Sequence, residues 1–283
     1  GSIYHINKSF LNAFWALGHS PMILVYHNIS EQVLTDYTVS VRTFIRHMEY
    51  LKAYEVVYLD QYDPGNLRHV TLTFDDAYSD FVERGVPALK DFGYPFEIFV
   101  IGNHIGKSNT YDLGVEPELK CSDLEQLKTA VRMGGRLQWH SFSHPRLSSV
   151  SDDQLNHELE VPGYLSELFP PPNFRWLAYP YGDHNTNVVN AARFRFDGAV
   201  SVFDGDDADK HQIGRIEITE DTKFFLTSYE KDTEMAKMEN LLKVRDNELA
   251  NLETILNSKS WRMTAPLRRL STHVSRLKKI FGR

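Results

Sequence analysis

The sequence predicts an α/β protein built around a largely parallel sheet of about eight strands, with a helical extension at its C-terminus. Short apolar runs rich in Val, Ile and aromatic residues alternate with stretches of helical period, which is typical of βα units. The alternation stops near Thr227, where a heptad spacing begins. We therefore expect three parts: residues 1–228, a heptad-patterned helix over 229–258 and a basic tail over 259–283.

Eight segments are expected to form strands, because each is a short run enriched in β-branched and aromatic residues. In chain order they begin at Met22, Val56, Val70, Phe96, Arg136, Arg175, Phe196 and Ile213.

Amphipathic helices are expected between these strands. Phe44, Met48 and Leu51 recur at the spacing of one helix face. Ser122 and Glu125 have the spacing of a capping box before the next helix, which Gly134 can end. A further helix is expected to start at Ser151 and to be interrupted over residues 161–163.

The C-terminal region carries two further helical patterns. The first is a heptad seam, which fits either a helix packed on the domain or a coiled-coil homodimer. The second pattern, over 259–283, has eight Lys and Arg and no acidic residue. It fits a helix lying on an anionic membrane surface or an acidic partner, and equally a solvated helix that ends the protein. The seam consists of Met235, Met238, Leu242, Arg245, Leu249, Leu252 and Leu256.

Composition excludes several broad classes. The net charge is −7, and residues 1–258 alone carry 23 basic against 38 acidic residues, or −15, which argues against a nucleic-acid partner. No apolar run reaches 18 residues, and the first 20 residues do not resemble an export signal. Cys121 is the single cysteine and cannot form an internal disulfide, so a reducing compartment is permitted and we expect a cytoplasmic protein.

Polar residues recur at the carboxyl ends of the predicted strands. His27 ends the first, Asp75 and Asp76 follow the third, and His140 ends the fifth, with His144 four residues later. In a parallel barrel the carboxyl ends of the strands meet at one edge, so these side chains are expected to converge.

One Asp with two His is a ligand set suited to a divalent metal that keeps open positions for water and substrate. His140 and His144 can reach one ion if residues 140–145 form a turn. Taken alone, neither the His pair nor the Asp pair indicates a metal site. His residues at this spacing arise by chance, and an Asp pair after a strand often caps a helix. Their coincidence favours the metal site.

Three motifs together carry a resemblance to a known family. They are TFDD at 73–76, HSFSHP at 140–145 and RWLAYPYG at 175–182. Over residues 21 to about 220 the chain resembles the NodB-type polysaccharide deacetylases of carbohydrate esterase family 4. The resemblance implies that residues 1–228 form a distorted (β/α) barrel of about seven to eight strands.

The resemblance also implies a role for each motif residue. A divalent metal is implied, most simply Zn²⁺, with Co²⁺ or Ni²⁺ as alternatives. The resemblance implies that Asp75 is the general base and that Arg175 orients it. The implied metal ligands are Asp76, His140 and His144. The backbone amide of Tyr181 is implied to stabilise the oxyanion.

The sequence departs from the family pattern at two points. Ala77 follows TFDD where the family usually has Gly, so we expect an unstrained backbone there. The late strand with its catalytic histidine is missing, and ILVYHN at 23–28 resembles that strand moved to the front, as in the permuted deacetylases of biofilm poly-N-acetylglucosamine. His27 is therefore expected as the general acid, with His184 and His211 as reserves. The alternative is that His27 only bonds a loop carbonyl.

The implied reaction is metal-dependent hydrolysis of an N-acetyl group on an amino sugar. The segment SKSWRMTAPLRRL, over 258–270, resembles one found in bacterial surface-polysaccharide glycosyltransferases and their fused partners. With the basic tail it indicates an enzyme at the inner membrane leaflet that acts in O-antigen or capsule assembly, with a glycosyltransferase as partner. The alternative is a catalytically inactive sugar-binding or assembly module on the same fold, which scaffolds a glycosyltransferase through its helical tail.

Overall fold

A computed structural model describes residues 22–222, apart from 113–116, 203–204 and 206–207. The chain divides into two units, Gly1–Phe224 and Phe225–Arg283, and all described residues belong to the first. The predicted heptad helix over 229–258 and the basic tail over 259–283 lie outside the described residues.

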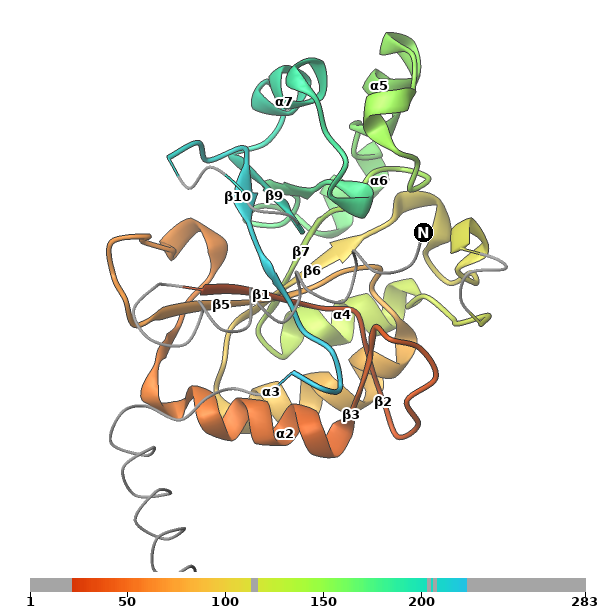
Figure 1. Ribbon diagram of the computed structural model, residues 1–283. Coiled ribbons are helices and arrows are strands. Elements are labelled where there is room, and N and C mark those ends of the chain that lie inside the picture. Colours follow the sequence, from red (N-terminus) through yellow and green to blue (C-terminus); the bar gives the residue numbers. More distant parts are fainter. Residues whose placement is uncertain (1–21, 113–116, 203–204, 206–207, 223–283) are drawn as a thin grey trace, which may run out of the picture. The chain divides into compact units, whose positions relative to one another are not determined.

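The described part is a parallel sheet curled into a nearly closed barrel of eight strands (Figure 1). The order around the barrel is β10-β9-β8-β7-β6-β5-β1-β11, and a short ninth strand, β4, pairs with β5. β10 pairs with β9 at one end of this order, and β11 pairs with β1 at the other. Arg215 joins β10 directly to β11, so the chain itself crosses the remaining gap.

The strands are short, as expected for a barrel with helices outside it. Their bounds are β1 Met22–Tyr26, β2 Asn28–Ser30, β3 Thr38–Ser40, β4 Glu55–Val56, β5 His69–Phe74, β6 Phe96–Val100, β7 Gly135–Trp139, β8 Trp176–Ala178, β9 Gly198–Ser201, β10 Ile213–Gly214 and β11 Ile216–Glu217.

The helices form two groups around the barrel. α2, α3 and α4 lie beside β1, β5 and β6, whereas α5, α6 and α7 lie on the side of β9 and β10 (Figure 1). Their bounds are α2 Val41–Tyr50, α3 Val86–Phe92, α4 Leu124–Arg132, α5 Asp152–Glu158, α6 Gly163–Leu168 and α7 Thr186–Arg193.

Each predicted strand segment overlaps a strand, which confirms the α/β fold class, although the segment starting at Val56 overlaps β4 at that residue alone. The segment starting at Ile213 is divided into β10 and β11 by Arg215, and the small parallel pair β2-β3 was not predicted. The helices predicted around Phe44 and after Ser151 are also present, and Ser151 caps α5.

The predicted capping box of α4 is wrong by one residue. The N-cap is Asp123, whose carboxylate accepts from the backbone N–H of Gln126 at 2.9 Å, while the Gln126 side chain accepts from the N–H of Asp123 at 3.0 Å. Ser122 instead belongs to the preceding loop, where its N–H donates to the Ala77 carbonyl.

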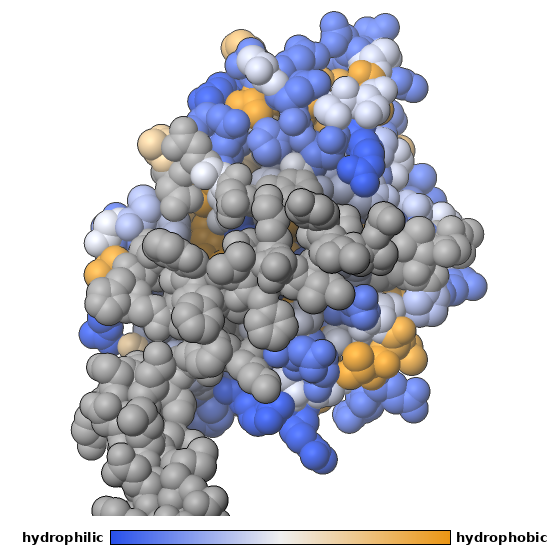
Figure 2. All heavy atoms as spheres, viewed as in Figure 1, coloured by the Kyte–Doolittle hydropathy of each residue, from blue (hydrophilic) through white to orange (hydrophobic). Residues whose placement is uncertain are grey.

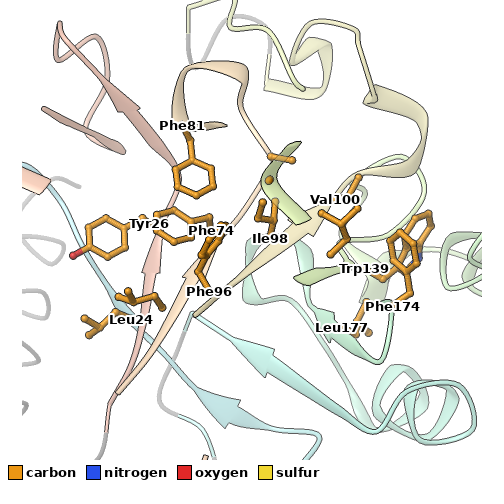
Figure 3. Close-up of a cluster of buried hydrophobic side chains, with 14 of the residues drawn as sticks. Leu24, Tyr26, Phe74, Phe81, Phe96, Ile98, Val100, Trp139, Phe174 and Leu177 are labelled. Carbon is orange, nitrogen blue, oxygen red and sulfur yellow. The ribbon is translucent and has the colours of Figure 1, made fainter. Parts of the chain in front are cut away.

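The main core lies between the outer face of the sheet and the helices. Alternate residues of β1, β5 and β6 point outwards into an aromatic cluster, which Figure 3 shows around Tyr26, Phe74, Phe81 and Phe96. Phe74 stacks on Phe81 with ring centroids 3.8 Å apart and meets Phe96 edge to face. Residues at the other parity face the barrel interior, so Asp75 points inwards directly after Phe74.

The surface in Figure 2 is largely hydrophilic where residues are described, with a hydrophobic cluster over the loop between β2 and β3. Val33 and Leu34 are the exposed aliphatic residues of that loop. Within the described residues, no helix has both the length and the apolar character that spanning a membrane requires.

Candidate active site

Apart from Arg175, the predicted site residues lie at one edge of the barrel, because they follow strands at their carboxyl ends. His27 follows β1, Asp75 and Asp76 follow β5, His140 follows β7, and Tyr181 lies in the turn Pro180–Gly182 after β8. All strands of the barrel are parallel, so these positions share an edge.

Asp76, His140 and His144 are buried, and each offers a ligand atom within 4.8 Å of the other two. The two Nε2 atoms lie 3.3 Å apart, and each is 3.7 Å from Oδ1 of Asp76. Ligands on a tetrahedral zinc ion with bonds of 2.0–2.1 Å are about 3.3 Å apart. The three atoms therefore have the spacing of three corners of such a coordination sphere.

The protonation of the two histidines also fits a metal. Nδ1 of His140 donates to the carbonyl of Ala178 at 2.8 Å, which leaves Nε2 as the atom with a free lone pair. Burial lowers the pKa of His140, and it lowers the pKa of His144 well below the usual value. Two neutral imidazoles facing one carboxylate are the donor set of a divalent cation.

The loop between the two histidines has an unusual backbone. Ser141 and His144 both have positive φ, 63° and 65°, a region that residues other than Gly seldom occupy. The Ser141 hydroxyl accepts from the backbone N–H of His144 at 2.9 Å, which closes the turn predicted for residues 140–145.

Asp75 is held separately from the metal ligands by a buried arginine. Arg215 donates to Oδ1 of Asp75 at 2.8 Å and to Oδ2 at 2.6 Å. Burial alone would raise the pKa of Asp75, but the Arg215 charge and its hydrogen bonds bring the pKa well below the usual range. Asp75 is therefore ionised at neutral pH, and its Oδ2 lies 3.8 Å from Nε2 of His140.

The prediction that Arg175 orients Asp75 is wrong. Arg175 comes before β8, so it lies at the amino end of that strand and away from the site. Its exposed guanidinium pairs with Asp197 instead. Arg215 was not predicted from the sequence as a site residue. It lies within the otherwise largely apolar run IGRIEI, and a charge buried in a strand needs a partner, so a pairing could have been expected.

His27 is half-buried at the same edge. It directly follows Tyr26, whose carbonyl accepts from the backbone N–H of Asp75 at 2.9 Å, so His27 and Asp75 lie on neighbouring stretches of chain. The ring packs against Tyr37 with centroids 5.0 Å apart, and its buried Nδ1 has no hydrogen-bond partner among the described residues.

Both reserve histidines donate to main-chain carbonyls. Nδ1 of His184 donates to the carbonyl of Gly182 at 2.9 Å. His211 lies on the loop after β9, as expected, but its Nε2 donates at 3.0 Å to the carbonyl of Phe196, which precedes β9 at the opposite edge of the barrel. The structure therefore does not bring His211 to the site.

Aromatic rings surround the metal ligands on the solvent side. Tyr111 and Tyr181 pack on the His144 ring at 4.5 and 4.6 Å, and the Tyr181 hydroxyl donates to Asp112 at 3.1 Å. The Arg146 guanidinium lies 4.7 Å from the centre of the Tyr181 ring. Tyr181 itself has positive φ, so its position is set by this packing rather than by local preference.

The expectation of an unstrained backbone at Ala77 is also wrong. Asp76 and Ala77 have φ of 67° and 52°, both in the left-handed region. The Ala77 carbonyl accepts from the N–H of Ser122 at 2.8 Å, and the Ala77 side chain is buried in the core. Tertiary contacts thus hold Ala77 in a left-handed conformation, which costs an alanine roughly 1–2 kcal/mol relative to the right-handed one.

The sequence profile of the family described as polysaccharide deacetylase matches residues 63–195, which include Asp75, Asp76, His140, His144 and Tyr181. This segment of the chain belongs to the polysaccharide deacetylase family. The Asp-His-His site and the nearly closed parallel barrel agree with that assignment.

Two relatives are similar to this chain in sequence. YxkH of Bacillus subtilis, named as a polysaccharide deacetylase, is 26% identical over 179 residues, which is 60% of each chain. The chain thus spans less than two thirds of the length of that relative. The poly-β-1,6-N-acetyl-D-glucosamine N-deacetylase of Staphylococcus epidermidis is 26% identical over 215 residues, 66% of this chain and 70% of the relative.

A solved structure shares the fold. The Streptococcus pyogenes deacetylase PplD, in complex with acetate, superposes with a TM-score of 0.58 at 23% identity, over 71% of this chain and 93% of PplD. At this identity the similarity establishes the NodB-like barrel.

Proposed function

We propose that the chain is a metal-dependent carbohydrate N-deacetylase, which hydrolyses the N-acetyl group of an amino sugar in a surface polysaccharide or its precursor. One observation carries this proposal. A buried Asp-His-His set suited to a divalent ion lies beside a second carboxylate, Asp75, which is kept ionised by Arg215. Hydrolysis of an amide needs both an electrophilic centre and a base, and this arrangement provides a place for each.

Asp76, His140 and His144 would hold the ion, for which Zn²⁺ is the simplest choice given two imidazoles and one carboxylate. When bound, the ion supplies Lewis-acid polarisation of the acyl carbonyl and makes water easier to deprotonate. Asp75 takes the proton of the attacking water, since its carboxylate is ionised and faces the same space.

The remaining residues stabilise or neutralise the charges that develop during hydrolysis. The backbone N–H of Tyr181 donates to the carbonyl oxygen as it becomes negative, an interaction worth about 3 kcal/mol for one good donor. His27 donates a proton to the nitrogen as the C–N bond breaks, so that the products are acetate and a free amino sugar. The packing of His27 against Tyr37 restricts the orientation of its ring.

The substrate we propose is a polymer or precursor containing N-acetylhexosamine. The Staphylococcus epidermidis relative is named for poly-β-1,6-N-acetyl-D-glucosamine, which supports an N-acetylglucosamine unit. The basic 259–283 segment and its resemblance to glycosyltransferase-associated sequences support a role in O-antigen or capsule assembly, at the cytoplasmic face of the inner membrane. Co-purification with membranes, compared with a chain ending at residue 228, tests this setting.

Acetate release tests the proposed reaction. The full chain is stripped of metal with a chelator, reloaded with Zn²⁺ and incubated with N-acetylglucosamine oligomers. We expect acetate only from the reloaded protein, and release about 10²–10⁴ times slower from the reloaded Asp75→Asn variant. A Zn²⁺-loaded protein that binds the oligomers without releasing acetate would instead indicate a sugar-binding module.

A further inference from the structure

We propose that Glu158 is a positioning residue for the metal centre, which holds the loop between His140 and His144 in its ligating conformation. Glu158 is the last residue of α5 and is only 6% exposed. The inference concerns metal binding, so its test needs no turnover assay and stands apart from the proposed reaction.

Glu158 contacts the loop with both its side chain and its main chain. Its Oε2 accepts from the backbone N–H of Ser143 at 2.7 Å, and its Oε1 accepts from the Ser143 hydroxyl at 2.6 Å. Its carbonyl accepts from the N–H of Phe142 at 3.0 Å and from Nε1 of Trp139 at 2.9 Å. Four hydrogen bonds thus join this one residue to the segment 139–143.

The loop needs such support because its backbone is unfavourable. Ser143 lies between Ser141 and His144, whose φ values of 63° and 65° persist only where the surroundings impose them. If Ser143 is released, the loop can relax to ordinary backbone angles, and Nε2 of His144 then moves away from Nε2 of His140. The Ser143–Glu158 pair therefore acts on metal geometry through its effect on His144.

The stability of α5 does not explain why a carboxylate is buried at its C-terminal end. A negative charge at the C-terminal end of a helix is disfavoured by the helix dipole, and a buried carboxylate must be hydrogen-bonded to be tolerated. Both needs are met here by donors from the metal-binding loop rather than from α5. The two main-chain bonds remain in any side-chain variant, so α5 stays attached to the loop when the carboxylate is changed.

The test compares Zn²⁺ affinity of the metal-free full chain, measured by competition with a chelating dye, with its melting temperature. We expect Glu158→Met to weaken Zn²⁺ binding on the order of 10-fold, the lower end for residues that orient metal ligands. Glu158→Gln should retain most of the affinity, because its amide oxygen can accept from the Ser143 N–H while its NH₂ donates to the hydroxyl. Glu160→Met, at an exposed position two residues later, is the matched control.

Ser143→Ala provides a second variant that leaves α5 unchanged, and it decides the matter should Glu158→Met fail to fold. We expect it to weaken Zn²⁺ binding less than Glu158→Met does, because the backbone N–H of residue 143 still donates to Oε2 of Glu158. It should add little when combined with Glu158→Met, which already removes both side-chain bonds. The proposal is overturned by wild-type Zn²⁺ affinity in Glu158→Met or in Ser143→Ala, by an equal loss in Glu160→Met, or by a fall in melting temperature without a fall in affinity.

Discussion

Replacing Arg215 by Met tests whether this residue, rather than Arg175, keeps Asp75 ionised. The side chains of Arg215 and Asp75 are 0% and 2% exposed, so the change leaves a carboxylate buried without its cation. Removing one partner of such a pair destabilises a protein by about 3–5 kcal/mol. The variant can avoid burying the charge by protonating Asp75. At pH 7, about three units above the ordinary Asp pKa, protonation costs about 4 kcal/mol at 1.36 kcal/mol per unit.

The effect should depend on pH with a definite sign. In the wild type the folded pKa of Asp75 is depressed, so its stabilising contribution is present above the unfolded value of about 3.9 and is lost only as pH falls through the folded pKa. In Arg215→Met burial raises the pKa of Asp75 instead, and protonating Asp75 costs less free energy as the pH falls. The destabilisation should therefore shrink by about 1.36 kcal/mol per pH unit between pH 7 and pH 4.

Urea unfolding of the metal-free protein across this pH range measures the effect. Arg175→Met is the matched control, and because its ion pair is exposed we expect a loss of only about 0–1 kcal/mol. Adding Asp75→Asn to Arg215→Met should remove this additional pH dependence relative to the wild type, since no ionisable group remains at position 75. The reasoning is refuted if Arg175→Met destabilises as much as Arg215→Met, or if the loss in Arg215→Met is small and independent of pH.

Three further variants test the roles in the site. Asp75→Asn should lower kcat by about 10²–10⁴ while Zn²⁺ affinity is unchanged, because Asp75 is the base and not a ligand; a loss of Zn²⁺ binding measured by competition would contradict that role. His27→Ala should lower kcat by a similar factor in the acetate assay, whereas His211→Ala, at the opposite edge of the barrel, should not; the reverse result would move the acid to His211. Deleting residues 229–283 should leave kcat on small oligomers unchanged, because the proposed site residues all lie between His27 and Arg215; a fall in kcat with intact folding would bring the tail into the reaction.

The metal ligands could be predicted because their positions follow from a local rule. Asp76 is the second residue after one apolar run that forms a strand, and His140 is the first residue after another. Parallel strands bring their carboxyl ends to one edge. His144 follows from the short turn after His140. Their places at the ends of strands can therefore be predicted locally, whereas the contacts that orient them, such as the bond from His140 to Ala178, cannot.

Arg215 could not be placed in the same way, because its partner Asp75 is 140 residues away. The pairing arises where the chain passes from β10 to β11 and nearly closes the barrel, which is a property of the whole topology. The left-handed backbone at Ala77 was missed for a related reason. Alanine disfavours it locally, and a hydrogen bond from the distant Ser122 imposes it.

The central claim is that Asp76, His140 and His144 bind one divalent ion while Asp75 stays unligated. A crystal of the Zn²⁺-loaded chain, measured at the zinc absorption edge, tests it directly. We expect one anomalous peak about 2.0–2.2 Å from a carboxylate oxygen of Asp76 and from Nε2 of both histidines, with Asp75 still paired to Arg215. A peak ligated by Asp75, or no peak between the two histidines, would contradict the account.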